Sequence, residues 1–145
     1  MKIFLDTNVL LDILAKREPF YAASAEVWSL AESGAVQGCI STISFNNIYY
    51  VVRKMAGKCN ADKALRILRD IFVPVAPDTL ILNQAIDSTM NDFEDAIQFH
   101  SAIRAGADCL ITRDPRHFKE VKTNLAISTP DEFLAVWRQR CARQK

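Results

Sequence analysis

Apolar residues along the chain alternate between short continuous runs and longer stretches in which they recur every three or four positions. Short apolar runs are typical of buried strands, whereas the wider spacing is typical of helices with one buried face. The runs predict strands at residues 2–5, 38–41, 72–76, 109–111 and 126–128. The wider spacing predicts helices over residues 9–14, 21–33, 44–55, 61–71 and 93–105, from Asp78 to about Thr89, and from residue 129 onward.

Strands that alternate with helices indicate the α/β class, because each helix returns the chain to pair the next strand in parallel. We therefore expect a three-layer α/β/α sandwich around a central, mostly parallel sheet of four or five strands. Pro74 lies in the 72–76 run and cannot donate a ladder hydrogen bond, so this strand is expected at a sheet edge. The sequence Thr129-Pro130-Asp131-Glu132 is a capping box with proline at the first helical position, and it predicts where the last helix begins.

The composition fits one compact domain. A chain of 145 residues that is 50% apolar can bury a core of its own, so we expect a single domain over residues 1–145, with a short basic helix or tail from about residue 136. The 18 Lys and Arg nearly balance the 17 Asp and Glu, which excludes a disordered chain and a polycation. No run approaches the roughly 18 apolar residues of a membrane span, and we expect a cytoplasmic protein.

The four cysteines do not indicate a metal or disulfide framework. They stand at positions 39, 59, 109 and 141, without the pair spacing of a zinc site. Cys39 and Cys109 fall in apolar strand-like runs and are expected to be buried thiols.

Carboxylates follow two of the predicted strands at the ends where an α/β sheet binds ligands. Asp6 comes directly after the first strand, and Asp114 comes three residues after the 109–111 strand. Asp92 and Asp95 begin the 93–105 helix, where their spacing puts both on one helix face. Converging carboxylates repel one another unless a hard cation lies between them. The pattern therefore predicts a Mg²⁺ or Mn²⁺ site for phosphoryl transfer.

Each of these carboxylates also has an ordinary structural explanation. Asp6 and Asp92 stand where helix N-caps are expected, and Asp114 precedes Pro115 as a turn residue would. Asp95 is harder to explain in this way, because it falls within an otherwise apolar helical face and an ionised group there needs a partner. The prediction rests on the convergence of all four.

Three segments together resemble PIN-domain ribonucleases of the kind found as VapC-like toxins. They are residues 3–12 with Asp6-Thr7-Asn8, residues 94–102 that open Glu94-Asp95-Ala96-Ile97, and residues 106–114 that end Thr112-Arg113-Asp114, followed by Phe118. Their order and separation agree with the family from Lys2 to about Leu134. The runs of residues 46–50 and 92–95 point to a bacterial subgroup with Asn-Asn in place of the usual second acidic residue.

The resemblance implies an acidic pocket that binds Mg²⁺ or Mn²⁺ and cleaves RNA, with Asp6, Asp95 and Asp114 as catalytic residues and metal ligands. The family's second acidic residue, usually Glu, corresponds to Asn47 here, or to Asn46 if the register shifts by one. An amide brings no charge and cannot act as a base. Either Asp92 supplies the missing carboxylate as a further metal ligand, or the domain binds RNA or a protein without cutting it. We favour retained activity, since Mg²⁺ needs few direct protein ligands.

Further residues are assigned supporting roles. Asn8, Ser44, Asn47 and Thr112 are short polar groups expected near the carboxylates. Three basic residues beside Asp114 are candidates for RNA contact, namely Arg113, Arg116 and Lys119. His117 is interpreted as a surface histidine. The resemblance also implies a separate antitoxin chain as partner. Aromatic residues on adjacent helices, among them Trp28, Phe45, Tyr49 and Tyr50, are most simply core, and any that are exposed are interpreted as a homodimer or antitoxin surface.

A different enzyme class also places Asp after a first strand and binds Mg²⁺. Phosphatases and receiver domains that form an aspartyl phosphate need a second, nearby Asp and a Lys after a later strand. Here Asp6 is followed by Thr7 and Asn8, and no Lys directly follows the 109–111 strand. The aspartyl-phosphate class is therefore the remote alternative.

Overall fold

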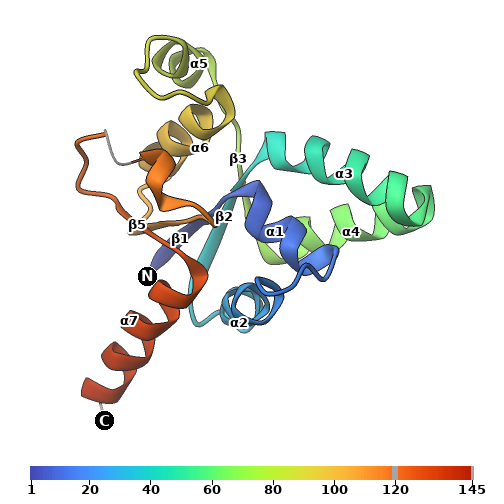
Figure 1. Ribbon diagram of the computed structural model, residues 1–145, viewed down its shortest axis with the longest axis horizontal. Coiled ribbons are helices and arrows are strands. Elements are labelled where there is room, and N and C mark those ends of the chain that lie inside the picture. Colours follow the sequence, from blue (N-terminus) through green and yellow to red (C-terminus); the bar gives the residue numbers. More distant parts are fainter. Residues whose placement is uncertain (119–120, 145) are drawn as a thin grey trace.

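The computed structural model describes residues 1–118 and 121–144, which contain one sheet of five strands. Figure 1 shows helices on both sides of this sheet. The strands are β1 (Lys2–Leu5), β2 (Gln37–Ser41), β3 (Val73–Val75), β4 (Cys109–Ile111) and β5 (Ala126–Ser128). Their order in the sheet is β3-β2-β1-β4-β5, and every neighbouring pair is parallel. The predicted α/β class is confirmed, and β3, which contains Pro74, lies at an edge as expected.

The helices connect the strands in the predicted order. They are α1 (Thr7–Leu14), α2 (Tyr21–Glu32), α3 (Thr42–Ala56), α4 (Lys58–Ile71), α5 (Thr79–Ile86), α6 (Phe93–Arg104), the short 3-10 helix η1 (Pro115–Phe118) and α7 (Pro130–Arg143). The predicted capping box is present at the start of α7. Within the described residues, no helix combines the length and apolar character needed to cross a membrane.

Several helix ends differ from the predicted ones, and for three of them the structure shows a local reason. α3 begins at Thr42, directly after β2, because the Ser41 side chain accepts a hydrogen bond from the Ile43 amide and caps the helix. α4 begins at Lys58, because Gly57 has φ 86° and acts as C-cap of α3 and N-cap of α4 at once. α5 ends at Ile86, three residues early. The Ser88 hydroxyl accepts a hydrogen bond from the backbone amide of Met90, and this local turn competes with continuation of the helix.

Alternation along β1 sends side chains to two separate hydrophobic clusters. Ile3 and Leu5 pack with residues of α1, α2, α3, α4 and α7. Phe4 lies on the other face and packs against Phe99 and Ala102 of α6. This period of two is what a strand buried on both faces requires, and it creates the three layers.

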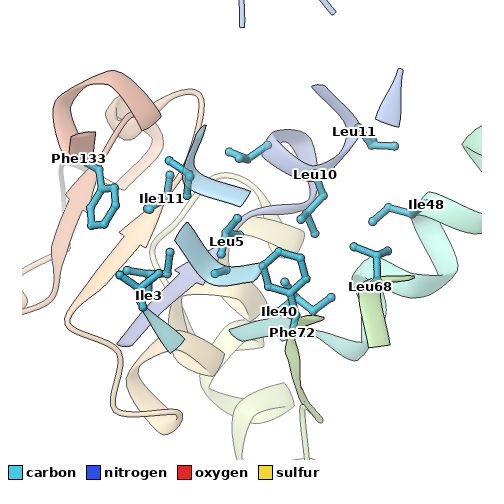
Figure 2. Packing of buried hydrophobic residues seen from close by; sticks show 14 of the residues in the cluster. Ile3, Leu5, Leu10, Leu11, Ile40, Ile48, Leu68, Phe72, Ile111 and Phe133 are labelled. Carbon is cyan, nitrogen blue, oxygen red and sulfur yellow. The ribbon is translucent and has the colours of Figure 1, made fainter. Parts of the chain in front are cut away.

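The larger cluster joins the sheet to the helices on its first face. Figure 2 shows Leu10, Ile48 and Leu68 converging from α1, α3 and α4 beside Leu5 of the sheet. Because α1 and α3 are both fixed in this cluster, their N-terminal turns are held at the carboxyl ends of β1 and β2. Cys39 and Cys109 are buried thiols, as predicted, and burial raises the pKa of each.

Candidate active site

Asp6 is the residue at which the central strand ends and α1 begins. Its backbone amide donates to the Ile111 carbonyl (2.9 Å), which extends the pairing of β1 with β4 by one residue. Asp6 occupies the N-cap position of α1 but its side chain makes no capping hydrogen bond, so helix capping does not account for the residue. The carboxylate is only 4% exposed and accepts a hydrogen bond from the Thr112 hydroxyl (2.9 Å).

The Asp6 carboxyl lies in surroundings that disfavour its charge. The pKa of Asp6 is raised to about 6, mainly by burial and to a smaller extent by the nearby carboxylates of Asp95 and Glu94. The hydrogen bond from Thr112 opposes this shift without cancelling it. An ionised Asp6 therefore lacks a full counter-charge in its surroundings.

The first turn of α6 carries the other carboxylates. Asp92 is its N-cap, and its Oδ1 accepts from the Asp95 amide (2.9 Å), so the predicted capping role of Asp92 is confirmed. Glu94 and Asp95 follow in the first turn. Burial raises the pKa of Asp95, the neighbouring Asp92 adds to the rise, and His117 opposes it.

These elements enclose a pocket of about 310 Å³. It lies where the end of β1, the first turns of α1 and α6, and α3 meet. Its lining residues are Asp6, Thr7, Asn8, Leu11, Asn47, Asp92, Glu94, Asp95 and His117. The structure thus brings together three of the four predicted metal ligands, together with Asn8 and Asn47.

Glu94 is a pocket residue that the sequence reasoning did not select. Its Oε1 accepts a hydrogen bond from Nδ2 of Asn47 (2.9 Å), which joins α6 to α3 across the pocket. The sequence instead offers Asp92, at the start of the same helix, as the carboxylate that could replace the second acidic residue. The signal that identifies Glu94 is its position in the first turn of a helix whose N-terminus points at the pocket.

Asp114 is held at the side of this site by basic residues. Both of its oxygens are 2.9 Å from nitrogens of Arg116, which lowers the pKa of Asp114 to about 2, and the residue does not line the pocket. His117 lies between two carboxylates, with Nδ1 2.9 Å from Asp95 Oδ2 and Nε2 3.5 Å from Asp114 Oδ2. The interpretation of His117 as a surface histidine is therefore incomplete, because the ring is exposed but also lines the pocket.

Two of the three RNA-contact candidates are engaged within the protein. Arg113 donates to both oxygens of Asp12, a carboxylate that is 1% exposed, and its guanidinium lies 4.4 Å from the centre of the Phe20 ring. Arg116 is paired with Asp114 as described above. The third candidate, Lys119, lies outside the described residues. Arg113 thus fixes the loop after β4 to α1.

A buried polar cluster supports the pocket from behind. The hydroxyls of Thr7 and Ser44 lie 2.7 Å apart, and Gln98 Nε2 donates to Thr7 (2.9 Å). All three side chains are buried, and they come from α1, α3 and α6 respectively. The cluster therefore fixes the relative positions of the three helices that line the pocket.

The donor chemistry of the pocket fits a hard divalent cation. Its polar lining supplies carboxylate and amide oxygens, and the raised pKa of Asp6 shows that negative charge there is under-compensated. Within residues 1–118 and 121–144, however, no three His, Cys, Asp or Glu side chains are already arranged around one metal position. The pocket therefore fits a divalent cation in its charge and in the type of its donor atoms. Asp6 and a carboxylate of α6 are the residues that would hold the cation.

Comparison with known proteins connects this site to a family. The family model described as "PIN domain" matches residues 2–116 of the chain. The chain belongs to the PIN domain family. The match includes Asp6, Asp95 and Asp114 together with the Asn47 position, and it confirms the family resemblance found in the sequence. The subgroup marked by Asn46 and Asn47 stays a prediction.

Similar proteins extend the comparison beyond the family model. Ribonuclease VapC1 of Aquifex aeolicus (strain VF5) is 22% identical over 144 residues, which cover 94% of this chain and 95% of that protein. The DNA-bound VapBC structure from Salmonella typhimurium covers 90% of this chain and 98% of its own, with TM-score 0.68 and 20% identity. Mycobacterium tuberculosis VapC20, a sarcin-ricin loop cleaving toxin, covers 85% of this chain and 98% of its own, with TM-score 0.66 and 15% identity. These two structures share the fold of this PIN domain.

Proposed function

We propose that this PIN domain is a Mg²⁺- or Mn²⁺-dependent endoribonuclease and the toxin of a toxin–antitoxin pair. The observation that carries the proposal is the position of Asp6, a buried carboxylate that shares one pocket with Asp92, Glu94 and Asp95. The similar Aquifex protein is a ribonuclease, and the similar Mycobacterium protein is a toxin that cleaves the sarcin-ricin loop. Both support the proposal.

The residues of the pocket have separate tasks in this reaction. Asp6 and Asp95 would hold the cation, which when bound supplies charge stabilisation and an activated water for phosphodiester hydrolysis. Thr112 orients Asp6 through its hydroxyl, and Asn8 on the pocket wall offers an amide for a bound water or a phosphate oxygen. Asp114 completes the acidic set once Arg116 releases it.

Glu94 supports retained activity despite the amide at position 47. Asn47 cannot supply charge, but it donates its amide hydrogen to Glu94 and so holds a carboxylate at the same wall of the pocket. In this proposal Asn47 and Glu94 together replace the usual second acidic residue. Asp92 has one oxygen committed to capping α6, which makes it the weaker substitute.

The competing function is a PIN domain that binds RNA or a protein without cleaving it. The observation in its favour is that Asp114 is fully engaged by Arg116, so that a third ligand is not in place. Metal titration by calorimetry distinguishes the two functions. A nuclease binds Mn²⁺ and loses affinity with Glu94→Gln, whereas a non-catalytic module binds Mn²⁺ weakly in both forms.

We also propose two protein partners, a separate antitoxin chain and a second copy of this chain. The Salmonella VapBC complex supports a separate antitoxin chain. A homodimer is supported by exposed apolar side chains on α5 and the start of α6, namely Leu80, Leu82, Ile86 and Phe93. Sedimentation equilibrium tests it: a monomer at all accessible concentrations contradicts the homodimer.

Cleavage of RNA is the direct test of the nuclease. The purified chain is expected to cut RNA with Mg²⁺ or Mn²⁺ and to be inactive in EDTA. Asp6→Asn and Asp95→Asn should each lower the rate of RNA cleavage by more than about 100-fold. Loss of a residue that only supports a metal ligand typically costs roughly 10- to 100-fold. Asp70→Asn, at an exposed position of α4, is the matched control and should retain full activity. Activity that survives both pocket variants, or that never appears, contradicts the proposal.

A further inference from the structure

An acidic pocket that cuts RNA needs cations beside it to hold the phosphate backbone. The two candidates nearest the pocket, Arg113 and Arg116, are already paired with Asp12 and Asp114. Basic charge is instead concentrated on the hairpin of α3 and α4, which Figure 1 shows running side by side away from the sheet. Residues 42–71 contain six basic residues, Arg53, Lys54, Lys58, Lys63, Arg66 and Arg69, against only Asp62 and Asp70.

One face of α3 connects the pocket to this basic hairpin. Asn47 lines the pocket, and Tyr50 and Lys54 follow at i+3 and i+7, so the three side chains share one side of the helix. Along the helix axis Tyr50 lies about 4.5 Å and Lys54 about 10 Å beyond Asn47. This face of α3 therefore extends from the carboxylates of the pocket to the cation of Lys54. The distance between them matches a short stretch of nucleic acid.

Tyr50 is placed as a stacking surface on this face. Its side chain is 66% exposed, although a tyrosine can bury a large apolar ring. The neighbouring Tyr49 ring meets it edge-on at 80°, with centroids 6.1 Å apart, and Arg53 in turn lies 5.9 Å from the Tyr49 centroid. These contacts support Tyr50 from one side and leave most of its surface in solvent.

The cation on this face is available for a phosphate. Lys54 is exposed, and it forms no ion pair with any carboxylate in the part of the chain that the structure describes. Lys58, one turn further, is by contrast paired with Asp62 at 2.7 Å. Lys54 is thus the uncommitted charge nearest the pocket along this face of α3.

We propose that Asn47, Tyr50 and Lys54 form a subsite that binds a single-stranded segment of the RNA substrate beside the cleaved phosphate, with a base stacked on Tyr50 and a phosphate at Lys54. A single strand is required because stacking on a side chain needs a base that is not already stacked within a duplex. The inference rests on the proposed nuclease function and adds the class of RNA and the direction in which it lies. A polypeptide bound along the same face is the competing occupant.

Fluorescence anisotropy with a labelled single-stranded RNA tests this subsite. The titrations use the Asp6→Asn background in EDTA, so that the RNA stays intact. Tyr50→Ala is expected to weaken binding by at least about fivefold, and Tyr50→Phe to bind normally, because stacking on an aromatic ring is lost only in the first. Lys54→Gln should lower the slope of log affinity against log salt by about 0.7, whereas Lys54→Arg keeps it. Binding of the same sequence as a duplex should not respond to Tyr50→Ala.

Control variants separate this inference from the proposed function. Tyr21→Ala on α2 and Arg143→Gln at the end of α7 remove the same side-chain types away from the pocket and should leave RNA binding unchanged. If the pocket-side variants change affinity no more than these controls, the subsite is wrong, the nuclease proposal stands, and the face is left to a polypeptide partner. If no variant binds RNA and the wild-type chain cleaves none, the proposed function fails and the subsite fails with it.

Discussion

Asn47 on α3 donates a hydrogen bond to Glu94 on α6 across the acidic pocket, with 2.9 Å between Nδ2 and Oε1. The pair joins the position where the family carries its second acidic residue to a carboxylate supplied by a different helix. The charge needed at this wall of the pocket is therefore present, although the residue at position 47 is neutral.

This hydrogen bond predicts that RNA cleavage requires Glu94. It also predicts that the carboxylate can be moved from position 94 to position 47 with most of the activity kept. Glu94→Gln is expected to lower RNA cleavage by about 10- to 100-fold, because the carboxylate is lost while the side-chain shape is kept. Asn47→Glu alone places two carboxylates together and is expected to raise the pKa of one of them.

The double variant Asn47→Glu/Glu94→Gln moves the charge from α6 to α3 and should recover most of the activity. A double-mutant cycle of cleavage rates measures this coupling. Strictly additive losses, with no recovery in the double variant, contradict the exchange.

Asp6 predicts a pH-dependent stability of the metal-free protein. Its folded-state pKa of about 6 is raised above the ordinary value of 3.8. Protonated Asp6 thus contributes stability that is fully present below about pH 4 and is lost as the pH rises through 6. The difference between a pKa of about 6 and the ordinary value of 3.8 corresponds to about 3 kcal/mol as an upper value.

Replacement by an amide removes this dependence, since Asn has no charge to bury and its oxygen still accepts from Thr112. Asp6→Asn should therefore melt at higher temperature than the wild type at pH 7.5 in EDTA, by up to about 10 °C. At pH 4 the two proteins should melt together. Thermal denaturation followed by circular dichroism tests both conditions, and a less stable variant at pH 7.5 contradicts the assignment.

The strands, their parallel pairing and the placement of Asp6 and Asp95 at one edge of the sheet were predictable from the sequence for a physical reason, whereas the order of the strands was not predicted. Apolar runs separated by helices leave few topologies, and parallel strands present their carboxyl ends at one edge of the sheet. What lies beside those carboxylates depended on helix rotation and side-chain pairing. Glu94 is one residue from Asp95, and pattern alone did not show that it turns towards Asn47. The sequence likewise predicts Arg113 as a candidate for RNA contact, because its partner Asp12 is 101 residues away in the chain and the pattern does not show their pairing.

Arg113 predicts a loss of stability and not of RNA affinity. Arg113→Gln leaves the buried Asp12 without its main partner, and among the residues that the structure describes only Arg17 remains as a cation, 3.9 Å away. Removing one partner of a fully buried pair costs about 3–5 kcal/mol, and partial exposure of Arg113 reduces this to about 2–3 kcal/mol. Arg138→Gln, which breaks the exposed pair with Glu26, should cost less than about 1 kcal/mol.

Urea denaturation of the two variants measures this difference directly. The salt dependence of RNA binding should be the same for Arg113→Gln as for the wild type, since its guanidinium is committed to Asp12. A flatter salt dependence in Arg113→Gln would instead assign Arg113 to a phosphate contact.

The pairing of Arg116 with Asp114 is expected to weaken metal binding by the protein. Its guanidinium contacts both oxygens of Asp114, and a cation that uses Asp114 has to displace it. Arg116→Gln is therefore expected to bind Mn²⁺ more tightly, by a few-fold, in calorimetric titrations at pH 7. Weaker binding in this variant would show that Arg116 supports the metal site.

The central claim is that carboxylates from the end of β1 and the start of α6 jointly hold one divalent cation. Isothermal titration calorimetry with Mn²⁺ tests it most directly, using the wild type, Asp6→Asn, Asp95→Asn and the exposed control Asp70→Asn. We expect one site in the wild type and in Asp70→Asn, with affinity at least tenfold weaker in each pocket variant. No Mn²⁺ binding by the wild type, or equal affinity in all four proteins, would contradict the account.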